Sequence, residues 1–295
     1  SHSFLLFKET LIKNAITMDT YFDPIFLKHD TGLHPESANR FSLLLESLDK
    51  NKIKKPQNGE KYLNIAHTRE YIEQVKLTSK FGGRLDPDTP VSAKTYEAAC
   101  YAVGAAVDAS EKQGFALVRP PGHHAFANRG SGFCVFNSMA IAALRLAKDK
   151  KVFILDIDIH HGNGTEAIVL TQKNVKFLSI HEYPSYPGTG QENRGGNVIN
   201  VPLPPETNDK DYIKALEERV VPGIEEYTPD IIGVSVGFDT YYLDKAKVVG
   251  SDFFLTTKTY ERIREILEPY DKFFVMEGGY SPQGIMEGAH ALMDL

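Results

Sequence analysis

The chain has 295 residues, of which 42% are hydrophobic and 24% charged, and this size and composition predict one large α/β domain with a single core. The formal net charge is −6 and the 33 Lys and Arg residues form no block of like charge, so direct binding to nucleic acid or to an anionic membrane is not expected. Two cysteines cannot form a disulfide framework and no apolar run approaches the roughly 18 residues of a membrane span, which together favour the cytoplasm.

Apolar runs alternate with segments of helical periodicity along the chain, an order typical of a mainly parallel sheet with helices on both faces. Residues 1–14 are expected to form an N-terminal extension, followed by a single domain over residues 15–295. The predicted strands are 15–18, 63–66, 115–118, 151–157, 175–180, 197–203, 230–236 and 272–276. The predicted helices are 37–50, 92–111, 137–148, 208–219, 256–268 and 281–292. Residues 181–197 are predicted to be a loop because of their Pro and Gly content.

Polar residues follow five of the predicted strands on the carboxyl side. The segments are "RPPGHHA", "DIDIHHGNG", "IHEYPSYPGTG", "GFDTYY" and "EGGYS". Ligands of open parallel α/β sheets bind outside the carboxyl ends of the strands, so we expect the five segments to meet in one site.

The stretch "LDIDIHHGNG" (155–164) favours a metal ion at this site. Alternate residues of a strand point to one face, which places Asp156, Asp158 and His160 on the same side. Two buried carboxylates side by side are unfavourable without a counterion, whereas a divalent cation makes the arrangement favourable. Two of these residues with Asp239, at the end of another predicted strand, provide three ligands and leave a position for water, the pattern of a catalytic Zn²⁺ site. Fe²⁺ and Co²⁺ suit such oxygen-rich ligands as well.

Two further segments supply groups for proton transfer. The adjacent His123 and His124 are candidates for the base that takes a proton from water. Tyr280 follows Gly278 and Gly279, whose flexibility lets the loop place the phenol beside the metal, where it can donate to a developing oxyanion.

Seven motifs occur in a fixed order between residues 34 and 280. They are "HPES" (34–37), "RPPGHHA" (119–125), "GFCVFNS" (132–138), "DIDIHHGNGT" (156–165), "YPGTG" (186–190), "GFD" (237–239) and "EGGY" (277–280). Together they resemble the motifs of the histone deacetylase superfamily, which also includes acetylpolyamine amidohydrolases and acetoin-utilisation proteins. The resemblance implies an arginase-like, three-layer α/β/α fold with an eight-stranded, mainly parallel sheet. It also implies a Zn²⁺-dependent hydrolase that cleaves the N-acyl amide of acetyl-lysine or a related acylated amine.

The resemblance also implies a role for each residue of the metal site. Asp158, His160 and Asp239 are expected to bind one catalytic Zn²⁺ ion. Asp156 is expected to support His123 and, with Ser179, to bind a structural K⁺ ion.

The remaining catalytic roles follow from the same resemblance. His124 is expected to be the principal base and acid, oriented by Asn163, and Tyr280 to bind the substrate carbonyl oxygen. Some relatives carry Asp in place of Asn163, and the uncharged amide should leave His124 neutral more readily.

Four residues resemble the substrate-binding positions of the family. Phe133 and Tyr186 match the aromatic walls of an acyl-lysine tunnel, and Gly132 matches the point where the backbone approaches the substrate amide. Asp88 resembles the aspartate at the rim that grips the substrate backbone, although Asp86 can align there instead.

One segment departs from the family pattern. Residues 243–250, "LDKAKVVG", stand where many relatives have Asp-Pro-Leu-Gly. The glutamate of polyamine-selective relatives is absent here, with Ala246 as the nearest match, and this makes an acetylpolyamine substrate the less favoured alternative.

Two other functions compete with this interpretation. An arginase-like ureohydrolase needs two metal ions, but only Asp239 and Asp244 follow "SVGF", without an Asp-x-Asp-x-x-Asp pattern. The second competing function is that of a catalytically silent relative that binds acylated ligands. Because all the expected catalytic residues are present, inactivity would require a blocked tunnel.

Overall fold

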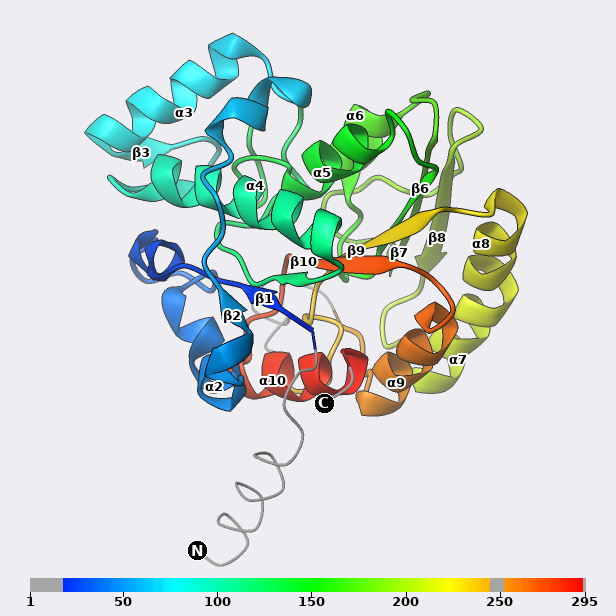
Figure 1. Ribbon diagram of the computed structural model, residues 1–295. Coiled ribbons are helices and arrows are strands. Elements are labelled where there is room, and N and C mark those ends of the chain that lie inside the picture. The colour runs from blue at the N-terminus through cyan, green and yellow to red at the C-terminus, as the bar shows by residue number, and fades with distance from the viewer. Residues whose placement is uncertain (1–17, 245–251, 294–295) are drawn as a thin grey trace, which may run out of the picture.

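The computed structural model describes residues 18–244 and 252–293, and within these ranges eight strands form one sheet between two layers of helices (Figure 1). The strands are β1 (Thr20–Tyr21), β2 (Ile53–Lys54), β5 (Phe115–Ala116), β6 (Val152–Asp156), β7 (Val175–Glu182), β8 (Val198–Leu203), β9 (Ile231–Val236) and β10 (Lys272–Met276). Their order is β2-β1-β5-β10-β9-β6-β7-β8, and every neighbouring pair is parallel. The predicted fold class, a three-layer α/β/α arrangement around an eight-stranded parallel sheet, is confirmed.

Helices cover both faces of the sheet. The α-helices are α2 (Ser42–Ser47), α3 (Arg69–Phe81), α4 (Thr95–Lys112), α5 (Ser138–Leu146), α6 (Asn163–Val169), α7 (Asp209–Ala215), α8 (Val221–Tyr227), α9 (Thr257–Leu267) and α10 (Pro282–Leu292). Helices α3 to α6 lie on one side of the sheet in Figure 1, and α2 and α7 to α10 lie on the other. Short 3₁₀ helices are η1 (Pro24–Lys28), η2 (Ala38–Phe41), η3 (Lys50–Lys52) and η4 (Glu60–Ile65), and a π-helical segment, η5 (Leu216–Val220), joins α7 to α8. A separate antiparallel pair consists of β3 (Gly83–Arg84) and β4 (Pro90–Val91).

The local sequence explains why these elements form. The central strand β6, "VFILD", is buried at every position, as expected for a parallel strand covered on both faces. Helix α4 buries a row of alanines that includes Ala98, Ala102 and Ala105, and these small side chains let it lie close to the sheet. The hydroxyl of Thr68 caps α3 by accepting from the amide of Tyr71.

Six of the eight predicted strands are found at their predicted places. The other two, 15–18 and 63–66, are not observed as strands in the described residues. The strand predicted over 63–66 is wrong: residues 63–65 belong to a 3₁₀ helix, η4, and Ala66 is its C-cap. The buried residues of this segment are Leu63 and Ala66, and their spacing of three residues is that of a 3₁₀ turn, not of a strand. The predicted strand 15–18 lies outside the described residues except for Met18, and the first strand begins at Thr20. Residues 1–14, expected to be an extension, and Ala246 also lie outside them.

Several elements have no counterpart among the predictions. Strand β2 contains only two residues, too few for an alternating pattern of apolar side chains. Helix α3 could have been predicted, because its buried residues Tyr71, Ile72 and Val75 have helical spacing. The strand predicted over 151–157 ends at Asp156, so the residues after it do not follow strand alternation.

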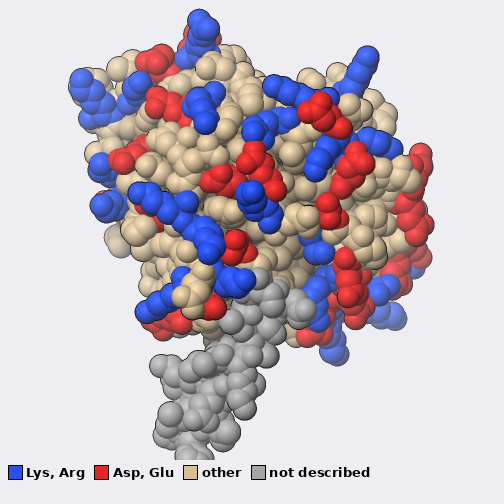
Figure 2. All heavy atoms as spheres, viewed as in Figure 1, with Lys and Arg blue, Asp and Glu red and all other residues tan. Residues whose placement is uncertain are grey.

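The visible surface is mixed in charge. Figure 2 shows Lys and Arg interspersed with Asp and Glu over this face, without a large area of one sign. No helix in residues 18–244 and 252–293 combines the length and apolar character needed to cross a membrane.

Candidate active site

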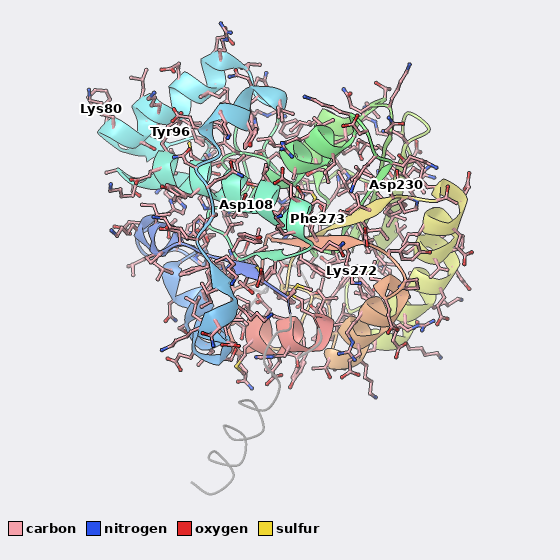
Figure 3. The ribbon with its side chains drawn as sticks, in the orientation of Figure 1. Lys80, Tyr96, Asp108, Asp230, Lys272 and Phe273 are labelled. Carbon is pink, nitrogen blue, oxygen red and sulfur yellow. The ribbon has the colours of Figure 1, made fainter. Side chains whose placement is uncertain are left out.

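A cavity of about 450 Å³ lies at the carboxyl ends of the parallel strands. It is lined by His34, Pro35, Asp88, Pro121, His123, His124, Gly132, Phe133, Cys134, His160, Tyr186, Gly278 and Tyr280. The amino ends of the strands are at the other edge of the sheet, where Asp230 precedes β9 and Lys272 opens β10, with the buried Phe273 next in the strand (Figure 3). The five polar segments therefore meet in one place, because each follows a strand of the same parallel sheet.

Asp158, His160 and Asp239 form a buried cluster beside this cavity. Their ligand atoms all lie within 4.8 Å of one another, and both carboxylates are completely buried. Asp158 Oδ1 lies 3.1 Å from His160 Nδ1, and Asp239 Oδ2 lies 3.4 Å from the same nitrogen.

The chemistry of this cluster fits a divalent cation. Asp239 Oδ2 is buried and makes no well-formed hydrogen bond among the described residues, only the 3.4 Å contact with His160 Nδ1, and a cation relieves this unfavourable state of a carboxylate oxygen. A Cβ atom at Gly278 would lie 2.3 Å from Asp239 Oδ2 and 2.5 Å from Asp158 Oδ2, so the backbone leaves this space open. The set of two carboxylates and one imidazole is one that Zn²⁺ accepts.

The pKa shifts in the cluster are also consistent with a metal site. Burial lowers the pKa of His160, but the close contacts with the Asp158 and Asp239 carboxylates and their charges outweigh it and raise the pKa to about 9. Burial and the neighbouring Asp158 raise the pKa of Asp239. A metal ion must therefore displace a proton from His160, and its affinity falls with decreasing pH.

The two adjacent histidines have opposite protonation preferences, although their rings lie 4.0 Å apart. Burial opposes a charge on His123, yet Asp158 and Asp156 raise its pKa well above the usual value, and His123 Nδ1 donates to Asp156 Oδ2 at 3.0 Å. Burial, His123 and His160 lower the pKa of His124 well below the usual value. The pair therefore combines an imidazole whose surroundings favour the charged form with one whose surroundings favour the neutral form.

Asn163 fixes the tautomer of His124. Its Oδ1 lies 2.8 Å from His124 Nδ1, and because a carbonyl oxygen only accepts, Nδ1 carries the proton. His124 Nε2 is then the nitrogen with a lone pair, and the residue lines the cavity.

Tyr280 lines the same cavity from the loop after β10. The Arg40 guanidinium lies 5.1 Å from the centre of its ring, and the Phe133 ring lies 5.9 Å away. Burial and the charge of Asp239 raise the pKa of Tyr280 well above its usual value, so the phenol keeps its proton and can donate it in a hydrogen bond.

The cavity walls contain the residues expected to contact substrate. Gly132 adopts a φ of +53°, and a Cβ there would lie 2.6 Å from the His124 ring. The ring of Tyr186 lies 5.1 Å from that of His124, and Tyr186 is 42% exposed. Asp88 is exposed and lines the mouth, whereas Asp86 accepts a 3.1 Å hydrogen bond from the Gly132 amide.

The residues expected around a K⁺ ion are neighbours across the sheet. Asp156 of β6 pairs in register with Ser179 of β7. The Ser179 hydroxyl bonds to His181 Nδ1 at 2.9 Å, and Asp156 Oδ1 accepts from the Asp158 amide.

A buried ion-pair network was missed from the sequence. Arg119 donates to both carboxylate oxygens of Glu36, at 2.5 and 2.7 Å, and Arg40 also pairs with Glu36. Arg40 then donates to the backbone oxygens of Glu277 and Gly279, next to Tyr280. The motifs "HPES", "RPPGHHA" and "EGGY" contain most of these residues, but only the structure shows that they touch.

The comparison with known families decides the identity of this site. A sequence profile described as "Histone deacetylase domain" matches residues 34–295, which include the cavity residues. The chain belongs to the histone deacetylase family.

Relatives in this family cover most of the chain. It is 33% identical to a probable deacetylase of Archaeoglobus fulgidus, over 90% of this chain and 82% of the relative. It is 31% identical to Histone deacetylase 14, chloroplastic, of Arabidopsis thaliana, over 88% of this chain and 72% of the relative. Both matches are to proteins named as deacetylases.

Solved structures share the fold. The HDA15 HD domain superposes with a TM-score of 0.86 at 31% identity, covering 93% of this chain and 89% of that one. An acetylpolyamine aminohydrolase from Burkholderia pseudomallei superposes with a TM-score of 0.82 at 22% identity, covering 94% and 97%. The histone deacetylase family and its fold are therefore established for this chain, which supports hydrolysis of an acetylated substrate.

Proposed function

We propose that this chain is a Zn²⁺-dependent deacetylase that hydrolyses the N-acyl amide of acetyl-lysine or a related acylated amine. The observation that carries the proposal is the convergence of the buried cluster Asp158, His160 and Asp239 with a neutral His124 and a protonated Tyr280 around one cavity.

The three residues of the cluster would hold the metal ion. A Zn²⁺ ion bound there supplies a Lewis acid for the acyl carbonyl and lowers the pKa of water. The buried Asp239 Oδ2, which makes no well-formed hydrogen bond among the described residues, and the space left by Gly278 support this assignment.

His124 is the proton acceptor in the proposed reaction. Its Nε2 is unprotonated and can accept a proton, because Asn163 holds the ring proton on Nδ1 and the low pKa keeps the imidazole neutral. His123 lies beside it with a raised pKa, and its Nδ1 donates to Asp156. Either histidine can then return a proton to the leaving amine.

Tyr280 acts on the other side of the carbonyl. Its phenol donates a hydrogen bond to the oxygen that becomes negative as the amide is attacked. Phe133 and Tyr186 flank the path of the acyl-lysine side chain, and Asp88 stands at the mouth, where it can accept from a substrate amide.

Two substitutions test these roles. We expect Tyr280→Phe to lower kcat about 10²- to 10³-fold on a fluorogenic acetyl-lysine substrate, because it removes a donor to the developing oxyanion. We expect His124→Ala to lower kcat about 10²- to 10⁴-fold, because it removes the base. Tyr242→Phe is the matched control, since Tyr242 is 48% exposed and does not line the cavity. Unimpaired turnover by both site variants refutes the assignment.

The substrate class requires a separate comparison. Acetyl-lysine peptides, longer acyl-lysines and acetylpolyamines should be compared on one zinc-loaded preparation, with acetylpolyamine hydrolysis as the alternative function. Extra methylenes in the acyl chain change the binding free energy by only about 1–3 kcal/mol, so a difference in binding alone does not identify the substrate. The substrates should therefore be ranked by kcat/KM. A structural K⁺ ion near Asp156 and Ser179 and a cytoplasmic location stay predictions.

A further inference from the structure

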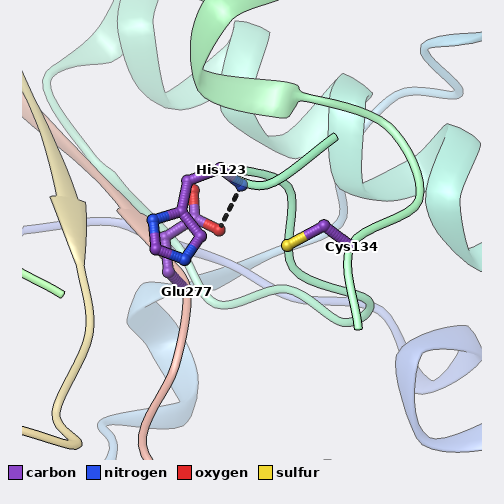
Figure 4. A group of neighbouring side chains, drawn as sticks. All are labelled: His123, Cys134 and Glu277. Atoms are coloured by element: carbon purple, nitrogen blue, oxygen red, sulfur yellow. Dashed lines mark hydrogen bonds between the residues drawn. The ribbon is translucent and has the colours of Figure 1, made fainter. Parts of the chain in front are cut away.

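The side chain of Glu277 contacts the turn that carries His123 and His124, although it has no role in the reaction described above. It follows the last residue of β10, is completely buried, and lies beside His123 and Cys134 (Figure 4). Its Oε2 accepts hydrogen bonds from the backbone amides of Gly122 at 2.7 Å and His123 at 3.0 Å.

We propose that Glu277 is a positioning residue, whose buried carboxyl clamps the Gly122–His123 backbone and so fixes where both histidine rings point. The inference rests on the proposed function, since it assigns a role toward the same histidines.

The turn that carries the histidines depends on this clamp for its amides. Pro120 and Pro121 have no N–H group, so Gly122 and His123 provide the next two donors along the chain. The carbonyls of the turn are bonded elsewhere, with the Gly122 oxygen accepting from Ala125 and the His123 oxygen from Thr165. Buried amides must find an acceptor, and one carboxyl oxygen serves both.

Glu277 is itself held firmly, as a clamp requires. Its backbone amide donates to Val236 of β9 at 2.8 Å, and its backbone oxygen accepts from Arg40. Its other carboxyl oxygen, Oε1, lies 3.4 Å from the Ser235 hydroxyl. The carboxyl therefore connects the end of β10 to the turn after the neighbouring strand β5.

The same neighbours also allow a metal ion to be considered, because ligand atoms of His123, Cys134 and Glu277 lie within 4.8 Å of one another. However, these potential metal-ligand atoms are already hydrogen-bonded or protonated. Glu277 Oε2 holds two amides, and burial together with the charge of Glu277 raises the pKa of the Cys134 thiol well above its usual value. A neutral thiol and an occupied carboxyl favour the clamp over a metal site.

The clamp depends on the length of the Glu277 side chain and not on its charge. Burial raises the pKa of Glu277 to about 7, and both the acid and the carboxylate keep an oxygen that accepts from two amides. Gln has the same length and keeps such an oxygen, whereas Asp keeps the charge but withdraws the oxygens by one methylene.

The test compares Glu277→Gln with Glu277→Asp on the zinc-loaded protein. We expect E277D to lower kcat on acetyl-lysine about 10- to 100-fold with KM nearly unchanged, because the histidines are displaced while the tunnel is not. We expect E277Q to retain most of the wild-type kcat. Ser235→Ala is the control, since it removes the neighbour of Oε1 without touching the amides. E277Q as impaired as E277D, or E277D as active as wild type, overturns the clamp.

A second readout separates this inference from the proposed function. The amide proton resonances of Gly122 and His123 in ¹⁵N-labelled protein should move in E277D and stay close to wild type in S235A, with or without turnover. If the wild-type protein hydrolyses no acylated amine, the proposed function fails, and the resonances still decide on the clamp. Unmoved resonances in E277D refute it.

Discussion

Burial and two neighbouring histidines determine how His124 titrates, and the hydrogen bond from His124 to Asn163 determines how its ring is oriented. Asn163 Oδ1 orients the imidazole at 2.8 Å without adding charge, and burial with two neighbouring histidines lowers the pKa of His124.

Replacing Asn163 with Asp should shift the pH dependence of activity. A carboxylate at this distance favours the imidazolium and raises the pKa of His124 by about one unit or more. Because only neutral His124 can act as a base, the acidic limb of the kcat/KM profile should move to higher pH. The measurement compares kcat/KM of N163D and wild type from acidic to neutral pH, and a limb that stays in place or moves to lower pH contradicts the role of His124.

At the scale of elements, the short segment after β10 brings several parts of the site together. The Gly278 amide donates to Asp158 Oδ2 at 2.8 Å, while Glu277 and Tyr280 on either side reach the histidine turn and the cavity. Such a crowded segment leaves no room for an added methyl group.

Gly278→Ala should therefore weaken metal binding. The new Cβ would lie within 2.5 Å of carboxylate oxygens of both Asp158 and Asp239, so the ligands must move apart. We expect a lower Zn²⁺ affinity in competition with a chromogenic chelator. Gly223→Ala is the control, since the nearest atom to its Cβ lies 3.4 Å away. Equal affinity of G278A and wild type would show that these carboxylates do not bind the ion.

The elements also show how far sequence reasoning reaches. Long apolar runs such as Val152–Asp156 and Ile231–Val236 were predicted correctly because buried parallel strands need continuous apolar sequence. Residues 63–66 were not, because a run of four apolar and polar residues fits a helical turn as well as a strand. Strand alternation selected Asp158 and His160, yet the strand ends at Asp156, and the loop after it brings them together. Contacts such as Arg119 with Glu36 join residues 83 positions apart and leave no local signal.

At the scale of the whole molecule, Glu36 connects the N-terminal region to the centre of the sheet. Burial opposes its charge, but Arg119 and further cations outweigh it and lower the pKa of Glu36 to about 2. Since the folded pKa lies below the unfolded value near 4.5, the stabilisation is complete above pH 4.5 and is lost as the pH falls toward 2.

Glu36→Gln should destabilise the protein at neutral pH. Removing one partner leaves Arg119 buried without its countercharge, which costs about 3–5 kcal/mol. The difference in melting temperature between wild type and E36Q should be largest at neutral pH and should shrink below pH 4.5. The exposed Glu225→Gln serves as the control in the same series of melts. A difference that stays constant with pH contradicts an ionised Glu36.

We expect deacetylation by this chain to depend on one metal ion held by Asp158, His160 and Asp239. The most direct test titrates chelator-treated protein with Zn²⁺ while acetyl-lysine hydrolysis is followed, with Asp239→Asn as the control. We predict that activity rises to a plateau at one ion per chain and that D239N gains none. Activity that is independent of Zn²⁺, or a plateau that requires two ions per chain, would contradict a mechanism with one metal ion.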